Sequence, residues 1–267
     1  MLPFDLWQAE RVAALTAENG WLNLTDRVEF SPGRQSVGAG LGQEIVLSVG
    51  PEHLGFLTLG PEGAVLETPE AALPFQPQAE GGPQLVHAGL ILEIHTVAGQ
   101  PALRVRLIDR PARLEFSGLR SFAFDPAWVI RARWEKLAEP LRQKIALKGG
   151  AQDAVTLTHR AVFQHEGSEI ALTPTHWKAK KPMFVIRDAT SGRKTFAAAR
   201  FLIGEDAGAA EITLDFNRAF NPPNAFTDLG ICPLPPPGNI LPFAIRAGEL
   251  APMQGNSPAP DQSWVRP

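Results

Sequence analysis

The sequence predicts a mainly β protein in which one N-terminal helix precedes an antiparallel sandwich and then a β-barrel or curled-sandwich domain. Three observations predict this class. Short apolar stretches alternate with Gly- and Pro-containing turns from about residue 21 onward. No helical spacers separate these stretches, which favours antiparallel pairing over a parallel sheet. The composition, 44% hydrophobic and 20% charged, is typical of a folded globular chain.

Residues 1–20 contain the clearest helical signal. Asp5 can cap the first turn, Gln8 stands at the capping-box position, and Asn19-Gly20 supplies a stop. Apolar positions such as Leu15 form a partial stripe along this segment. We therefore expect an amphipathic helix that docks on a sheet.

Residues 21–115 are predicted to form the sandwich. The Ser31-Pro32-Gly33 and Gly60-Pro61 turns separate its candidate strands, which are 21–24, 45–49, 55–59, 64–68, 85–86, 90–96 and 102–108. The stretch Ser36-Val37-Gly38 is similar to the start of a forkhead-associated sandwich, a fold that reads phosphothreonine. Ala39 stands where that motif has arginine. The resemblance therefore implies a forkhead-associated-like sandwich without phosphopeptide binding.

Residues 116–250 are predicted to form the second β domain, a barrel or a curled sandwich. Trp128–Trp134 alternates apolar and polar positions, as a half-buried strand does. Further candidate strands are 154–159, 161–165, 169–172, 182–188, 194–202 and 211–216. The tail, 251–267, is rich in Pro and polar residues, and we expect it to be disordered.

Charge and cysteine content narrow the partners and the compartment. A net charge of −3 gives no basic footprint, so neither nucleic acid nor an anionic membrane is an expected partner. The first residues lack a secretory-signal pattern, no apolar run is long enough to span a bilayer, and Cys232 is a lone cysteine. We expect a soluble cytoplasmic protein. The six histidines show no metal spacing, so no metal site is predicted, and the cofactor is unknown.

The C-terminal half carries a family resemblance. Asp188-Ala189-Thr190-Ser191-Gly192 is followed by Arg200-Phe201-Leu202 and then by the long run Asp215–Pro223. Two later blocks, Cys232–Pro237 and Ala244–Glu249, complete the pattern. Together these segments resemble the bacterial and archaeal family known as domain of unknown function 1684. That resemblance implies no established activity.

The sequence departs from the pattern of this family at positions that could carry chemistry. Lys194 stands where the family usually has glutamate, Phe196 where it has tyrosine, and Asn224 where it has cysteine. Gly238 replaces a second usual glutamate. The chain as a whole contains no tyrosine but 15 phenylalanines. The resemblance therefore implies a divergent member in which rings are kept and hydroxyl groups are lost.

One polar cluster is the candidate ligand site. Acids, amides and hydroxyls near a guanidinium can orient an anionic or polyol ligand, because arginine offers a fixed fork of donors. The same residues can instead form internal turns and a buried ion pair that locks strands together. The candidates are Asp188, Thr190, Thr195, Arg200, Asp215, Asn217, Arg218 and Asn221.

Two classes of function remain open on this basis. The first is a non-catalytic module that binds a small polar or anionic molecule or serves a structural role. The second is a hydrolase-type enzyme that uses Asp188 or Asp215 as general base. A carboxylate held by arginine is a poor base, which favours the first class. A flavin-binding split barrel is a third and more distant interpretation.

Overall fold

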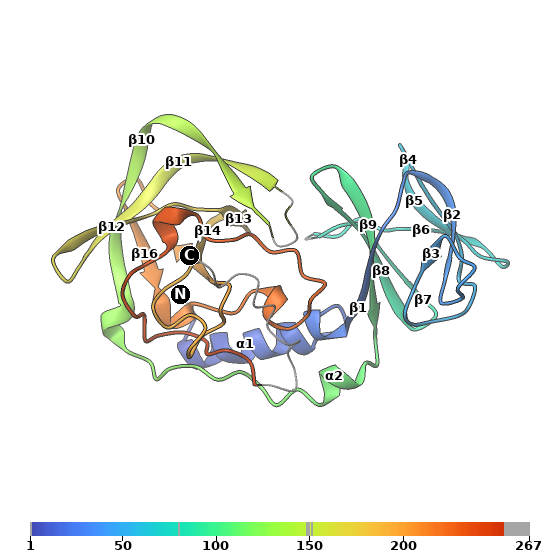
Figure 1. The fold of residues 1–267 in the computed structure, drawn as a ribbon, viewed down its shortest axis with the longest axis horizontal. Helices are drawn as coiled ribbons and strands as arrows, with labels where there is room; N and C mark the ends of the chain where they lie inside the picture. Colours follow the sequence, from blue (N-terminus) through green and yellow to red (C-terminus); the bar gives the residue numbers. More distant parts are fainter. Residues whose placement is uncertain (1, 80, 148–149, 151, 254–267) are drawn as a thin grey trace. The chain divides into compact units, whose positions relative to one another are not determined.

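The computed structural model describes residues 2–79, 81–147, 150 and 152–253 (Figure 1). The chain divides into two compact units, one formed by Arg11–Phe116 and the other by the first ten residues together with the chain from Ser117 onward. Strands account for 46% of the structure and helices for 13%, so the predicted mainly β class with an N-terminal helix is confirmed. Among the described residues, no helix is long and apolar enough to cross a membrane.

The N-terminal helix α1 spans Phe4–Thr16 and carries the chain from one unit into the other. Its exit requires a glycine, because a Cβ at Gly20 would lie 2.3 Å from the carbonyl oxygen of Leu15. A single-turn 3₁₀ helix, η1, follows at Trp21–Asn23, where the sequence predicted a strand. The Asn23 side chain donates to the carbonyls of Ala17, at 3.3 Å, and Glu18, at 2.8 Å. These bonds join the helix exit to the first strand.

The unit Arg11–Phe116 is a sandwich of two sheets. One sheet has four strands in the order β1-β9-β8-β7, and the other has five in the order β3-β2-β4-β5-β6. All pairs are antiparallel except β2 with β3, which is parallel. The apolar core between the sheets includes Val37, Leu57, Leu92 and Val105. The elements are β1 (Leu24–Glu29), β2 (Gly33–Gly38), β3 (Ile45–Val46), β4 (Gly55–Gly60), β5 (Gly63–Glu67), β6 (Ala72–Pro74), β7 (Gln84–His87), β8 (Leu90–Val97), β9 (Gln100–Leu107) and α2 (Pro111–Leu114).

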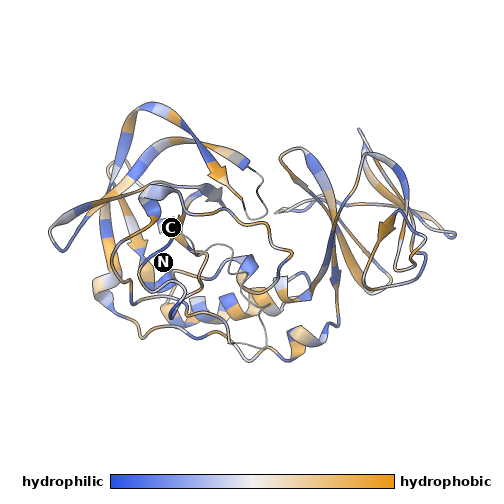
Figure 2. Cartoon of the chain, in the orientation of Figure 1, coloured by the Kyte–Doolittle hydropathy of each residue, from blue (hydrophilic) through white to orange (hydrophobic). Residues whose placement is uncertain are grey.

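The other unit is built on one sheet of seven strands in the order β12-β11-β10-β16-β15-β14-β13. Its core includes Trp134, Phe184, Leu214 and Phe216. Figure 2 shows hydrophobic and hydrophilic residues alternating along the β10–β11 ribbon. The strands are β10 (Val129–Ala146), β11 (Gln152–His165), β12 (Ser168–Leu172), β13 (His176–Lys178), β14 (Lys181–Ile186), β15 (Arg200–Glu205) and β16 (Glu211–Asp215), and the 3₁₀ turns are η2 (Pro126–Trp128), η3 (Phe216–Arg218), η4 (Pro223–Ala225) and η5 (Pro237–Asn239).

This sheet is not closed, so the predicted β-barrel is wrong in that respect. Within the described residues, the outermost strands β12 and β13 do not pair with each other. The Pro-rich segment 233–241 pairs with the chain just beyond β14 instead. The backbone amide of Leu241 donates to the carbonyl of Arg187 at 2.7 Å, and the amide of Arg187 donates to the carbonyl of Asn239 at 3.1 Å. The buried Asn239 amide donates at 2.9 Å to the carbonyls of both Thr173 and Val185. One side chain thus joins the end of β12 to β14 without a further strand.

Most of the predicted disordered tail, 251–267, lies outside the described residues. The part that is described, 251–253, has no regular secondary structure. The segment just before it is held tightly. Glu249 is fully buried, and its amide donates to Ala219 at 2.8 Å.

Gly248 is the glycine on which this tight packing depends. It has a φ of +82°, and a Cβ there would lie 2.5 Å from the Ala219 carbonyl oxygen and 2.8 Å from that of Phe216. Gly167 has a similar φ of +78° with nothing within 4 Å. We expect Gly167→Ala to cost about 1–2 kcal/mol, from backbone strain alone.

We expect Gly248→Ala to cost about 1–3 kcal/mol more than Gly167→Ala, because backbone atoms must also move. Urea unfolding of both variants measures the difference. Equal losses of stability in the two variants would contradict the close packing at Gly248.

Candidate functional site

The centre of the candidate site is a buried ion pair between Asp188 and Arg200. Asp188 lies just after β14, and Arg200 is the first residue of β15. The Nη2 atom of Arg200 donates to Oδ2 of Asp188 at 2.7 Å, and the two side chains are 1% and 0% exposed respectively. Neither charged group is therefore in contact with bulk water.

The same two side chains hold the C-terminal segment, residues 243–250. Arg200 donates through Nη1 to the Ala247 carbonyl and through Nη2 to the Ile245 carbonyl, the latter at 3.2 Å. Oδ1 of Asp188 accepts from the amide of Ile245 at 3.3 Å. The ion pair thus connects two strand ends to a stretch of chain some 45 residues later.

The loop 188–195 is shaped by its own short polar side chains. Oδ1 of Asp188 accepts from the Thr190 amide at 2.7 Å, which is the local bond that aspartate makes in a turn. The hydroxyls of Thr190 and Thr195 lie 2.9 Å apart and hydrogen-bond across the loop. Both threonines are buried, so these hydroxyls are used inside the protein.

Glu249 is a second buried acid near this arginine. Its Oε2 accepts from the backbone amide of Asn221 at 2.7 Å, and the Asn221 side chain donates to the Leu250 carbonyl at 2.7 Å. Burial lowers the pKa of Arg200 from its usual value, while the charges of Asp188 and Glu249 act to raise it. Arginine remains charged in proteins, so the two carboxylates offset the desolvation of one buried cation.

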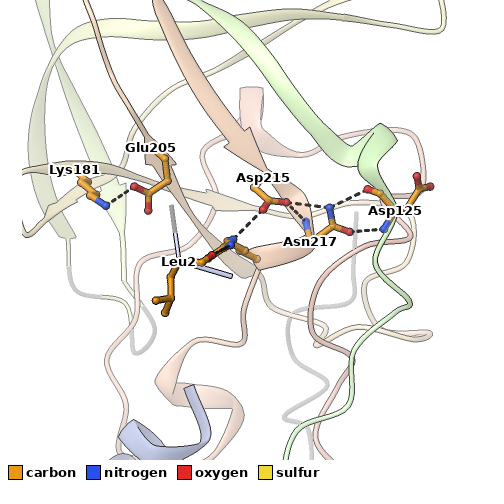
Figure 3. A network of polar contacts seen from close by, with 7 residues as sticks. Leu2, Asp125, Lys181, Glu205, Asp215 and Asn217 are labelled. Atoms are coloured by element: carbon orange, nitrogen blue, oxygen red, sulfur yellow. Dashed lines mark hydrogen bonds and ion pairs between the residues drawn. The ribbon is translucent and has the colours of Figure 1, made fainter. Parts of the chain in front are cut away.

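The remaining candidates form a second network around Asp215. Oδ1 of Asp215 accepts from the backbone amide of Asn217 at 3.1 Å and from its side chain at 3.0 Å. Asn217 in turn donates to the carbonyl of Asp125 and accepts from its amide, both at 2.9 Å. Figure 3 shows Asn217 between Asp215 and Asp125 in this chain of contacts.

Arg218 extends this network to the N-terminal residues. Its Nε donates to Oδ2 of Asp215 at 2.9 Å, and its Nη2 donates to the Leu2 carbonyl. The guanidinium also lies 5.7 Å from the ring centre of Trp7. Arg218 therefore connects the end of β16 to the first turn of α1.

The structure places the eight predicted residues in two networks rather than in one. Asp188, Thr190, Thr195 and Arg200 belong to the first, and Asn221 joins it through Glu249. Asp215, Asn217 and Arg218 form the second. The networks lie at the same end of the β15–β16 pair, because Phe201, next to Arg200, pairs with Phe220 beyond Arg218. In the described part of the chain, no three His, Cys, Asp or Glu side chains are grouped so as to hold a metal.

A further polar cluster, which the sequence interpretation missed, lies in the sandwich unit. Glu93, Arg104 and Arg106 are buried on adjacent strands, with Arg106 donating to Glu93 at 2.7 Å. Burial acts to raise the pKa of Glu93, but Arg106, Arg104 and the Gly82 amide outweigh it, so that pKa stays below its usual value. The available signal was Glu93 itself, a lone acid inside the apolar run 90–94.

Comparison with known proteins places the chain in a family. A model of the family described as protein of unknown function (DUF1684) matches residues 114–250, slightly more than half of the sequence. The chain belongs to this family. All eight predicted site residues and Glu249 lie within the DUF1684 span.

One solved structure with detectable similarity is the solution NMR structure of an uncharacterized protein from Haloarcula marismortui. The two sequences are 28% identical over a match that covers 53% of this chain and 80% of the Haloarcula marismortui chain, and the structures superimpose with a TM-score of 0.44. Comparison with curated proteins found no match.

The Asp188–Arg200 pair predicts a large loss of stability when one partner is removed. We expect Arg200→Met to cost about 3–5 kcal/mol, because it leaves the Asp188 carboxylate buried without its counter-ion. We expect the double variant Asp188→Asn/Arg200→Met to lose less, since no orphan charge remains. Hydrogen exchange followed peptide by peptide should show the loss of protection in residues 243–250.

Arg131 provides the matched control for that experiment. Its ion pair with Glu211 lies on the same sheet, but the side chains are 71% and 59% exposed. Arg131→Gln should leave exchange in residues 243–250 unchanged. Full protection of that segment in Arg200→Met would show that the buried pair does not hold it.

His95 in the sandwich unit predicts a specific pH dependence. The pKa of His95 is lowered to about 4, chiefly by burial and then by the charges of Arg104, Arg27 and Arg106, which Glu93 opposes. The unfolded chain takes up this proton near pH 6.5, so stability falls as the pH drops from about 6.5 to about 4. The loss is about 1 kcal/mol per pH unit.

We expect His95→Gln to lack this part of the pH dependence. Urea unfolding of both proteins at pH 7, 5.5 and 4.5, in buffers free of phosphate and sulfate, measures it. Parallel pH profiles for the two proteins would contradict a depressed pKa at His95.

Proposed function

We propose that the unit containing the DUF1684 span, formed by the first ten residues and the chain from Ser117 onward, is a non-catalytic structural β module. In this DUF1684 unit the acid–guanidinium network holds segments of the chain together and is not an active site. The supporting observation is how completely Asp188 is used. One carboxylate oxygen accepts from Arg200, and the other accepts from the amides of Thr190 and Ile245. A general base needs an oxygen within reach of the substrate.

The second acid of the hydrolase alternative is used in the same way. Both oxygens of Asp215 accept internal hydrogen bonds, from Asn217 on one side and Arg218 on the other. The Asp215 side chain is 5% exposed. A substrate would have to displace these donors before either carboxylate could take a proton, and this argues against the hydrolase.

The contacts also count against a ligand held by these eight residues. The guanidinium of Arg200 is committed to Asp188 and two carbonyls, and that of Arg218 to Asp215, Leu2 and Trp7. The terminal nitrogens of Arg200 and the Nε and Nη2 atoms of Arg218 are thus used on the protein's own chain, while Nε of Arg200 is buried without an acceptor among the described residues. The structural role we propose is to fix the C-terminal segment and the first turn of α1 on one sheet.

Arg218 gives the most direct test of this role, because its side chain is 13% exposed and the change should leave the fold intact. We expect Arg218→Gln to increase hydrogen exchange about tenfold or more in residues 4–10, since loss of charged hydrogen bonds costs about 1.5–3 kcal/mol. The control is Lys181→Gln, which breaks the exposed pair with Glu205 shown in Figure 3. Lys181→Gln should leave hydrogen exchange in residues 4–10 unchanged.

Assays for function complete the test. Wild-type protein should show no turnover above buffer with ester, phosphoester and glycoside substrates. Thermal shifts with anionic metabolites or sugars should be the same in wild type and Arg218→Gln. Turnover lost in folded Asp215→Asn, or a ligand shift lost in folded Arg218→Gln, would overturn the structural reading.

A further inference from the structure

One face of the four-stranded sheet in the sandwich unit carries charge where a buried face is usually apolar. Along β9, Leu103 and Val105 point into the sandwich core, so Arg104 and Arg106 point away from it. Arg104 pairs in register with Arg27 on β1 and with Glu93 on β8. We call this side the arginine face, which consists of Arg27, Arg104, Arg106, Glu93 and His95.

The arginine face is enclosed by residues of its own unit. The Trp21 ring centre lies 5.1 Å from the Arg104 guanidinium and 5.9 Å from that of Arg106. The Gly82 amide donates to Oε1 of Glu93 at 3.2 Å. Arg106 and Glu93 are therefore held as a pair beneath an aromatic ring.

Several donors on this face have no acceptor among the described residues. They are Nε and Nη2 of Arg27 and Nε of Arg106, and the Nδ1 atom of His95 is also without a partner there. The Arg27 side chain is 10% exposed, and its ion pair at 2.9 Å is with Glu29, which is 56% exposed. A buried polar group without a partner is destabilising, and more so when it is charged. Each such group calls for an explanation, and for the guanidinium donors a bound acceptor is one.

The charges on this face point to the kind of acceptor. Arg104 and Arg106 both pair with the buried Glu93, whereas Arg27 pairs with Glu29, which is exposed at the rim. Oxyanions satisfy guanidinium donors better than neutral groups do, because the hydrogen bonds are charge-assisted and fit the planar fork. An anion would also offset the mutual repulsion of the arginines.

We propose that the arginine face is a binding site for a small oxyanion, a phosphate or carboxylate group, taken up by Arg27 with Arg106 and Arg104 around it. This inference goes beyond the structural role proposed for the DUF1684 unit, because it concerns the other unit. Arg27 is the principal contact, since two of its nitrogens are unused in the described structure. β1 is the edge strand of its sheet, and Glu29 is exposed at the end of that strand, so the anion reaches Arg27 from this edge.

The test uses the full chain with inorganic phosphate and succinate as probes, against sodium chloride at equal ionic strength. We expect a saturable rise in Tm of about 2–4 °C with at least one oxyanion, and the stronger of the two identifies the phosphate or carboxylate class. Chloride should give no saturable rise. No shift and no heat of binding with either probe up to tens of millimolar would overturn the proposal.

Variants assign the effect to the arginine face. Arg27→Gln should raise the Kd for the oxyanion about tenfold or more, because charged hydrogen bonds are lost. Arg34→Gln is the matched control in the same unit, since Arg34 and its partner Glu67 have side chains that are 52% and 41% exposed. It should keep the wild-type Kd. Equal weakening in both variants, or none in Arg27→Gln, would refute the assignment.

Stability without an anion separates a binding site from a structural ion pair. Arg27→Gln removes an under-satisfied buried cation, so we expect its Tm in phosphate-free buffer to equal or exceed that of the wild type. A purely structural Arg27 would give a clear loss of Tm instead. A crystal structure grown with phosphate should show the anion on Arg27, and ordered water alone at that position would overturn the proposal.

His95 gives a readout that needs no variant at Arg27. An anion among Arg27, Arg104 and Arg106 counters their positive charge, which together with burial lowers the pKa of His95 and which Glu93 already opposes. The imidazole NMR signal of His95, assigned with His95→Gln, should move with phosphate and titrate at higher pH. A His95 signal that is unaffected by saturating phosphate would contradict binding on this face.

Discussion

The Asp188–Arg200 ion pair is the constraint on which the DUF1684 unit depends. Two ions with almost no exposure are stable only where further hydrogen bonds satisfy most of their donors and acceptors, because desolvation of a poorly satisfied pair outweighs the attraction. Here the partners come from the loop 188–195 and from residues 243–250. The pair therefore specifies where the C-terminal segment lies, more than it adds to stability.

The two polar clusters of the molecule differ in how far they are completed. Around Arg200, both terminal nitrogens of the guanidinium donate to Asp188 and to backbone carbonyls, and only Nε has no acceptor among the described residues. On the arginine face, Arg27 donates to a rim glutamate and keeps two nitrogens without a described acceptor. We infer that the nearly complete network around Arg200 serves the fold, whereas the two unused nitrogens of Arg27 are donors for an anion. This difference, rather than the number of charged residues, is why we propose the arginine face as the binding site.

The sequence predicted elements well where the alternation of residues was regular. The candidate strand 90–96 corresponds to β8, Leu90–Val97, and 211–216 corresponds to β16, Glu211–Asp215. It failed where local hydrogen bonds compete with a strand. The candidate strand 194–202 begins in a loop, because the Thr190 carbonyl accepts three successive amides there. The polar strand β2, Gly33–Gly38, gave no apolar signal and was missed.

The candidate site could be predicted in part for a related reason. Local turn chemistry identified Asp188 and Asp215, and the neighbouring arginines suggested ion pairs. The distance between the two networks depends on strand register, which a single sequence does not specify. The arginine face was missed for the same reason, because the partners of its side chains lie on other strands. Period-two alternation in Leu103–Leu107 shows that Arg104 and Arg106 share one side, but a charged side of a strand normally faces water. Only the positions of Trp21 and Glu93 reveal that these arginines are enclosed, because both guanidinium groups lie near the Trp21 ring and pair with the buried Glu93.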